Sequence, residues 1–441
     1  MRAILVRRII FVLATMMACF LVMGLFIIQA RYVGVRMGMV PTTKVSTEDI
    51  KIPNLHADGS VIADYCSEAV TTSGFENLSG RTSTAVSLDD AWFSHDSHFY
   101  QHDLATTCAV LAAVCNSESQ YYSNVKGSMP YAEQTLGALG FDDVRTESYA
   151  LRSSLLDELG TLFTGAHDVA AYTFASKTIS ATASTPATTL VFVGIRGSYG
   201  VEWLSNFNLS DASGAADHQG FRAAEDEVQR SLTKYIGSID ADPDHTRILI
   251  TGHSRGGAIA NLLAARLDNL SGTSDQLAPA SGIYAYTFAA PGATREADQH
   301  SATYENIFNI VNESDIVPQL PLSIWGYGRY GTTVTLPSVS SKGFDGLYEA
   351  MCDTFKRNTG VAPQVSEDDL ASLDAFGERA ARGLSSSEAF DSPLSIVSIV
   401  QALFGIDLGA ALNSHYPDTY IAWMQSVPAG YLSFSAPAHA A

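Results

Sequence analysis

Short apolar runs alternate with amphipathic stretches through the middle of the chain. Runs typical of buried strands cover residues 168–176, 188–197, 247–251, 283–292 and 306–320. Apolar residues recur at helical spacing over 104–115, 131–139, 221–236 and 258–267. The first two strand runs are separated by Pro186 and small residues, which predicts a hairpin connection. Strands that alternate with helices predict an α/β fold, with a mostly parallel central sheet and helices on both faces.

The first thirty residues follow a different pattern. Arg2, Arg7 and Arg8 precede an uncharged apolar run over residues 9–28. This run has the length of about 20 residues that a membrane-spanning helix needs, whereas the apolar core of a cleaved signal peptide is usually shorter. We therefore predict a cytoplasmic N-terminus over 1–8, a transmembrane signal-anchor over 9–30, and a cell-membrane protein whose remainder lies outside. A long, cleaved signal peptide with secretion of the rest is the alternative.

The remainder divides by composition. Residues 31–85 are rich in Thr, Ser, Gly and Asp and have few apolar residues, which indicates a stalk or loosely packed lead-in. The main domain is then expected over 86–441, with a polar insertion at about 336–405 that contains an acidic amphipathic helix.

Charge and cysteine content narrow the functional classes. The 441 residues are 46% hydrophobic, enough for a sizeable core, and the net charge of −20 argues against nucleic acid as a partner. Cys66, Cys108, Cys115 and Cys352 would lie in an oxidising compartment, where one or two disulfides could form in any of three pairings.

The strand at 247–251 leads into Gly-His-Ser-Arg-Gly-Gly and then directly into a helix. This context favours the Gly-x-Ser-x-Gly nucleophile elbow, in which Ser254 occupies a strained turn above the sheet. Side chains at positions 252 and 256 would clash with the strand and the helix, so glycine is expected there. A helix cap in a glycine-rich turn is the alternative interpretation.

A serine nucleophile needs a base, which in this architecture follows an acidic residue that itself follows the serine in the chain. Asp315 lies after a predicted strand, whereas Asp353 and Asp374 fall in the polar insertion. Of the histidines beyond Asp315, His439 lies in a small-residue tail, so His415 is the expected base. His253, beside the serine, is expected to point the wrong way along the elbow.

The negative charge that forms on a tetrahedral intermediate needs backbone donors. The N–H of Arg255, at the start of the helix after the serine, is one candidate. Ser198 is the second, because it follows an earlier strand and Gly197 permits a close backbone approach.

Seven pieces of the chain, in order, resemble the class 3 lipases, which are fungal-lipase-like α/β-hydrolases. The pieces are VFVGIRGS, Trp203, ITGHSRGGAIANLLA, YTFAAPG, NIVNESDIVPQLP, YGRYGTTV and SHYPDTY, between about residues 98 and 422. The resemblance implies an α/β-hydrolase fold, a triad of Ser254, Asp315 and His415, and an oxyanion hole at Ser198 and Arg255.

The resemblance also places a lid after the oxyanion serine. Val201, Leu204 and Phe207, with Trp203 between them, could form one apolar face of a short helix. Such a helix could swing onto a lipid surface and expose the serine. A helix packed against the domain is the alternative.

These features predict a serine ester hydrolase of lipase type that cleaves acylglycerols through an acyl-enzyme, with no metal or organic cofactor. A phospholipase A1, another acyl-ester hydrolase or an acyltransferase on the same fold is the first alternative, and a non-catalytic, surface-displayed interaction protein is the second. The expected partners are a lipid or other ester substrate and the membrane. The histidines at positions 95, 98 and 102 lie near two aspartates but are more typical of a polar helix face than of a metal site.

Overall fold

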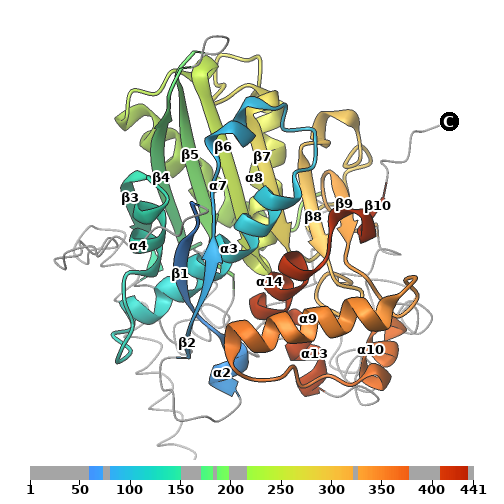
Figure 1. Cartoon of the computed structure of the whole chain (residues 1–441). Helices are drawn as coiled ribbons and strands as arrows, with labels where there is room; N and C mark the ends of the chain where they lie inside the picture. Colours follow the sequence, from blue (N-terminus) through green and yellow to red (C-terminus); the bar gives the residue numbers. More distant parts are fainter. Residues whose placement is uncertain are drawn as a thin grey trace, which may run out of the picture.

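The central element of the molecule is an eight-stranded sheet, seen in a computed structural model (Figure 1). The structure describes residues 59–72, 80–149, 170–181, 186–197, 216–320, 326–376 and 408–435. In spatial order the strands are β10 (Ser433–Ser435), β9 (Thr332–Thr335), β8 (Ile307–Val311), β7 (Ile283–Phe288), β6 (Thr246–His253), β5 (Thr188–Ile195), β4 (Tyr172–Ile179) and β3 (Asp142–Glu147).

The inner strands, from β5 to β9, are parallel to one another. The outer strands pair antiparallel, and β4 and β5 form the predicted antiparallel pair around Pro186. Every residue of β7 and β8 is buried, because helices cover both faces of the sheet. The predicted α/β architecture is therefore confirmed.

Four helices cover most of the two faces of the sheet (Figure 1). On one face lie α7 (Gln219–Ser238) and α8 (Arg255–Leu270); on the other lie α3 (His102–Tyr122) and α14 (Pro417–Ser426). Alternate strand residues feed the two cores: Ile248 and Ile250 pack toward α7 and α8, and Leu249 packs toward α3. The smaller helix α4 (Tyr131–Ala138) extends the α3 side.

Part of the predicted lead-in is folded. Strands β1 (Val61–Cys66) and β2 (Arg81–Val86) form an antiparallel pair, and α2 (Glu68–Thr72) follows β1. Val61, Ala63 and Tyr65 are buried in the same core as α3, so the prediction of a stalk up to residue 85 is wrong for these segments. The sequence carries no period-2 signal here, because β1 has one polar residue, Asp64, and the buried positions of β2 include Thr82 and Thr84. Residues 31–58 lie outside the described part of the chain.

The predicted insertion begins with ordered helices. Here α9 (Phe344–Thr359) packs against α14, with the rings of Phe344 and Trp423 6.3 Å apart. The acidic helix is present as α10 (Glu367–Asp374), and α13 (Leu408–His415) contacts α10 and α14. Residues 377–407 lie outside the described residues. Short 3-10 turns occur at Asp90–Ser94, Pro243–His245, Ala280–Gly282, Ala302–Tyr304 and Ala429–Tyr431.

Two further predictions concern a membrane anchor and disulfide bonds. The predicted signal-anchor over 9–30 lies outside the described residues, and within the described ranges no helix is both long and apolar enough to cross a bilayer. Cys108, Cys115 and Cys352 are free thiols in the structure.

Candidate active site

The turn between β6 and α8 carries Ser254 at the carboxyl edge of the parallel strands. β6 ends at His253 and α8 begins at Arg255, so the helix starts three residues earlier than the sequence pattern predicts. Ser254 has φ 56° and ψ −127°, a conformation that non-glycine residues rarely adopt. Its N–H donates to the carbonyl of Phe288 on β7 over 2.8 Å, which ties the strained turn to the sheet.

The glycines around this turn are required by close backbone packing, as the sequence predicts. A Cβ on Gly252 would lie 2.4 Å from the carbonyl oxygen of Gly256, and a Cβ on Gly256 would lie 2.3 Å from that of Ile195. Gly197 meets the turn equally closely, because a Cβ there would lie 2.6 Å from the carbonyl oxygen of His253. The end of β5 and the elbow can therefore touch only without side chains between them.

The structure brings Ser254, His415 and Asp315 into one hydrogen-bonded series. His415, the last residue of α13, has its Nε2 2.9 Å from Ser254 Oγ and its Nδ1 2.8 Å from Asp315 Oδ2. All three side chains are buried. With an ionised aspartate, Nδ1 must donate its proton, so Nε2 is left to accept from the serine hydroxyl. This is the arrangement that a base needs to activate a serine.

Two more donors hold the Asp315 carboxylate. The N–H of Val317 donates to Oδ1 over 2.9 Å, and the Tyr420 hydroxyl donates to Oδ2 over 2.8 Å. Burial and the neighbouring Asp315 raise the pKa of Tyr420 well above its ordinary value, so this hydroxyl keeps its proton. Arg329 interacts electrostatically with Asp315 and Tyr420, and burial lowers its pKa to about 10, which leaves it a cation at neutral pH. Neither Tyr420 nor Arg329 was predicted from the sequence, although each lies in a stretch that resembles the family.

His253 is hydrogen-bonded to the backbone of His415. Its Nε2 lies 2.8 Å from the carbonyl oxygen of His415, an atom that can only accept, so this nitrogen donates. Burial, and then the proximity of His415, lower the pKa of His253 well below its ordinary value, so the ring is neutral. His253 therefore faces the backbone of His415, in agreement with the prediction that it is not the base.

Only one of the two candidate oxyanion-hole donors, Arg255, lies in the described part of the chain. Arg255 begins α8, so its backbone N–H lies at the positive end of that helix. Ser198 and the candidate lid residues Val201, Trp203, Leu204 and Phe207 lie outside the described residues. Just before them, the N–H of Gly197 donates to Asn116 Oδ1 on α3 over 2.9 Å, which fixes the end of β5 beside the elbow.

The rival acidic residues lie elsewhere. Asp374 accepts a hydrogen bond from Ser314 Oγ over 2.6 Å, and Asp353 lies within α9. Neither is paired with His415, whose Nδ1 faces Asp315. His439 lies outside the described residues.

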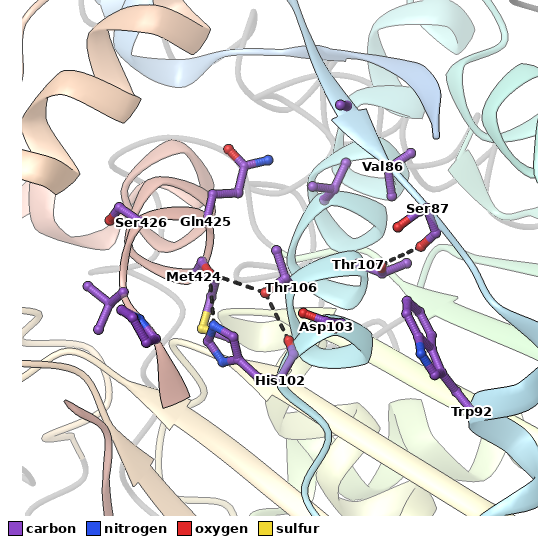
Figure 2. Close-up of a pocket in the computed structure, with 14 residues that line it drawn as sticks. Val86, Ser87, Trp92, His102, Asp103, Thr106, Thr107, Met424, Gln425 and Ser426 are labelled. Atoms are coloured by element: carbon purple, nitrogen blue, oxygen red, sulfur yellow. Dashed lines mark hydrogen bonds between the residues drawn. The ribbon is translucent and has the colours of Figure 1, made fainter. Parts of the chain in front are cut away.

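A separate cavity of about 420 Å³ opens between the start of α3 and the end of α14 (Figure 2). Trp92 lies on one side of it and Met424 on the other. Its lining includes His102, which is hydrogen-bonded through Nε2 to the Met424 carbonyl and through Nδ1 to the Tyr100 hydroxyl. The ring nitrogens are thus occupied within the protein. No triad residue lines this cavity, and no group of metal-binding side chains occurs in the described residues.

Comparison with known proteins finds one family match. Residues 192–325 match the sequence model of the family described as lipase (class 3). The matched segment contains Ser254 and Asp315, and His415 lies beyond it. The match confirms the resemblance to class 3 lipases that the motifs predict.

Individual relatives are more distant. The chain is 27% identical over 145 residues to "Secreted mono- and diacylglycerol lipase 1" of Fusarium solani, covering 31% of this chain and 41% of that protein. It is 29% identical over 152 residues to "Lipase" of Rhizomucor miehei, covering 32% and 40%. The matches thus span less than half the length of these two relatives. Among solved structures, the lipase from Rhizopus microsporus var. chinensis is 18% identical with a TM-score of 0.35, covering 66% of this chain and 84% of that one.

Proposed function

We propose that the protein is a serine ester hydrolase of lipase type, with acylglycerols as substrates. The observation that carries this proposal is the hydrogen-bonded series from Ser254 through His415 to Asp315, with contacts of 2.9 and 2.8 Å. The elbow and the acidic residue lie inside the segment that matches class 3 lipases. The substrate class is supported by the names of relatives such as the mono- and diacylglycerol lipase of Fusarium solani.

The proposed reaction has two halves. In the first, Ser254 Oγ attacks the ester carbonyl while His415 Nε2 takes the hydroxyl proton. Collapse of the tetrahedral intermediate breaks the bond to the alcohol, which leaves with the proton from His415. In the second, water attacks the acyl-enzyme, again losing its proton to His415, and the carboxylic acid is released as Ser254 recovers its hydrogen.

The other residues of the site stabilise the charges that form during the reaction. Asp315 keeps His415 in the required tautomer and stabilises the imidazolium that forms twice in the cycle. The N–H of Arg255 stabilises the oxyanion at the start of α8, and Ser198 is the proposed second donor. In related chemistry the loss of one such donor slows the reaction by about 10²–10³.

We further propose that the catalytic domain works outside the cell. The uncharged run over 9–28 supports export, either as an anchor or as a signal peptide that is cleaved. The secreted state is supported by the name of the Fusarium solani relative. A lid over 201–207 that opens on a lipid surface would suit such a location, and it remains part of the proposal.

A serine-reactive fluorophosphonate tests the nucleophile. The wild type is expected to be labelled and to hydrolyse p-nitrophenyl esters, diacylglycerol and triacylglycerol emulsions, and Ser254→Ala should do neither. Ser97→Ala is the matched control, because Ser97 is a buried serine whose hydroxyl donates to Ala280 at the opposite edge of the sheet. Equal labelling of wild type and Ser254→Ala would overturn the proposal, and hydrolysis of short soluble esters alone would restrict it to an esterase.

A further inference from the structure

The last carbonyl groups of α13, the helix that ends at the candidate base, accept hydrogen bonds from side chains elsewhere in the fold. Such carbonyls have no partner within their own helix and need donors from outside it. The donors and their acceptor carbonyls are Thr419 Oγ1 to Asn413, Asn312 Nδ2 to Ser414, and His253 Nε2 to His415. The backbone of the candidate base is therefore fixed at His415 itself and at the two residues before it.

His253 reaches the His415 carbonyl because of its position on β6. Side chains alternate along a strand, so those of Thr251 and His253 extend from the same face of the sheet. Thr251 Oγ1 donates to the carbonyl of Cys108 on α3, which identifies this face as the one that α3 and α14 cover. Here the His253 ring has its centroid 4.8 Å from that of His415 and 5.6 Å from that of Tyr420. The residue before the candidate nucleophile thus faces the candidate base.

This contact closes a short ring of three residues. A peptide bond joins His253 to Ser254, His253 Nε2 lies 2.8 Å from the carbonyl oxygen of His415, and His415 Nε2 lies 2.9 Å from Ser254 Oγ. The ring is local in space although 161 positions separate Ser254 from His415 in the chain. A displacement of about 1 Å between reacting groups can slow a reaction about 10²-fold, so a direct link between the two residues has a kinetic consequence.

The charge state of His253 suits this role. Burial, and then the proximity of His415, lower the pKa of His253 well below its ordinary value, so the ring is neutral and carries a single N–H. That N–H is at Nε2, because the carbonyl oxygen facing it can only accept. A neutral ring also adds no positive charge beside the imidazolium that would form on His415 during the reaction.

We propose that His253 is a positioning residue for the reaction, which holds the backbone of His415 so that its Nε2 stays within hydrogen-bonding distance of Ser254 Oγ. This inference deepens the proposed function, since it rests on His415 as the base. The sequence Gly-His-Ser then has two roles, because the serine supplies the nucleophile and the preceding histidine fixes the base against it. Loss of the donor should therefore slow the chemical step and leave substrate binding almost unchanged.

The values of kcat and KM for a soluble p-nitrophenyl ester test this inference. His253→Leu has no donor, so kcat should fall about 10²-fold while KM stays within about twofold of the wild type. His253→Gln should recover most of the lost rate, because the amide nitrogen of glutamine lies close to the position of Nε2 in histidine and can donate to the same carbonyl. An unchanged kcat in His253→Leu overturns the inference, and so does a His253→Gln variant that is no faster than His253→Leu.

His102 provides the matched control. It is another histidine whose Nε2 donates to a backbone carbonyl, that of Met424 at 3.1 Å, and it lies outside the candidate triad. His102→Leu should leave kcat and KM within about twofold of the wild type, and a fall in kcat equal to that of His253→Leu would overturn the inference. If His253→Leu does not fold, His253→Asn replaces it, because its amide is one methylene shorter than that of glutamine. Equal kcat values in His253→Asn and His253→Gln then count against the role of His253.

A second measurement does not require turnover. The Nδ1 proton of His415, which is donated to Asp315, should give a low-field NMR signal that is assigned by its loss in His415→Gln. This signal should broaden through exchange with water in His253→Leu and stay sharp in His253→Gln and His102→Leu. Should the wild type hydrolyse no ester, the proposed function fails, and the signal still decides whether His253 holds the ring of His415. An unchanged signal in His253→Leu shows that it does not.

Discussion

Two buried aspartates lie at opposite ends of β8 and differ in what surrounds them. Asp315 follows the carboxyl end of the strand, and Asp268, near the end of α8, contacts Asn306 just before the strand begins. Their side chains are buried to nearly the same degree, with residue exposures of 0% and 5%. Depth of burial therefore does not distinguish the two side chains.

The number of donors differs instead. Asp315 receives hydrogen bonds from Val317, His415 and Tyr420, which together stabilise an ionised carboxylate. Asp268 receives one, from Asn306 Nδ2 to Oδ1 over 2.9 Å, and within the described residues its Oδ2 is buried without a hydrogen-bond partner. Burial then dominates and raises the pKa of Asp268 to about 8, so that it is mostly protonated at pH 7. At nearly equal depth, the two carboxyl groups thus differ in how many hydrogen-bond donors surround them.

Replacing each aspartate by asparagine gives the largest expected contrast. Asp315→Asn leaves the shape intact but offers His415 an amide that favours the wrong tautomer, so kcat should fall about 10³–10⁴-fold. Asp268→Asn should leave kcat within about twofold of the wild type. Asp268 is remote from the site, and the variant replaces a mostly uncharged side chain with another uncharged one. Steady-state hydrolysis of a soluble p-nitrophenyl ester measures both. A fall of less than about tenfold in Asp315→Asn would show that this carboxylate is not the partner of the base.

Two residues of the candidate triad, Ser254 and Asp315, have local signals in the sequence. A nucleophile elbow needs a strand, a strained serine and a helix in immediate succession, and all three are visible around Ser254. Asp315 comes shortly after an apolar run that forms a parallel strand. The carboxyl ends of parallel strands meet at one edge of the sheet, where functional residues commonly lie. His415 followed from the order of the motifs and the scarcity of later histidines.

The supporting residues were not predictable in the same way, because their roles exist only after folding. His253 is hydrogen-bonded to a carbonyl 162 positions away, and the Asp418 carboxylate beside the site accepts from the N–H of Glu68, 350 positions away. No periodicity links such pairs. Composition also misled at residues 61–66, where Asp64 and the surrounding polar residues obscured a strand whose alternate side chains are buried. A polar average over a long window cannot reveal a short, mostly apolar strand.

The stability of the protein should depend on pH through Asp268. An unfolded aspartate loses its proton near pH 3.9, whereas the folded one keeps it up to about pH 8, so its contribution to the free energy of unfolding falls as the pH rises between these values. Asp268→Asn cannot ionise and lacks this loss. Relative to the wild type, the variant should therefore gain roughly 2–4 kcal/mol between pH 5 and pH 8. Urea unfolding at several pH values measures the difference, and a difference that is constant with pH would contradict the assignment.

Removing one donor from Asp315 should change kcat by an amount between the effects of the two asparagine variants. Tyr420→Phe deletes the hydroxyl that donates to Asp315 Oδ2, while the donors from Val317 and His415 remain. A hydrogen bond to a charged group contributes about 1.5 kcal/mol or slightly more, so kcat should fall about tenfold with little change in KM. Tyr284→Phe is the matched control, since Tyr284 is a fully buried tyrosine whose hydroxyl donates to the carbonyl of Phe93 far from the site. Equal rates in the two variants would mean that two donors suffice to keep Asp315 ionised and His415 oriented, and the third would then serve the packing of α14 alone.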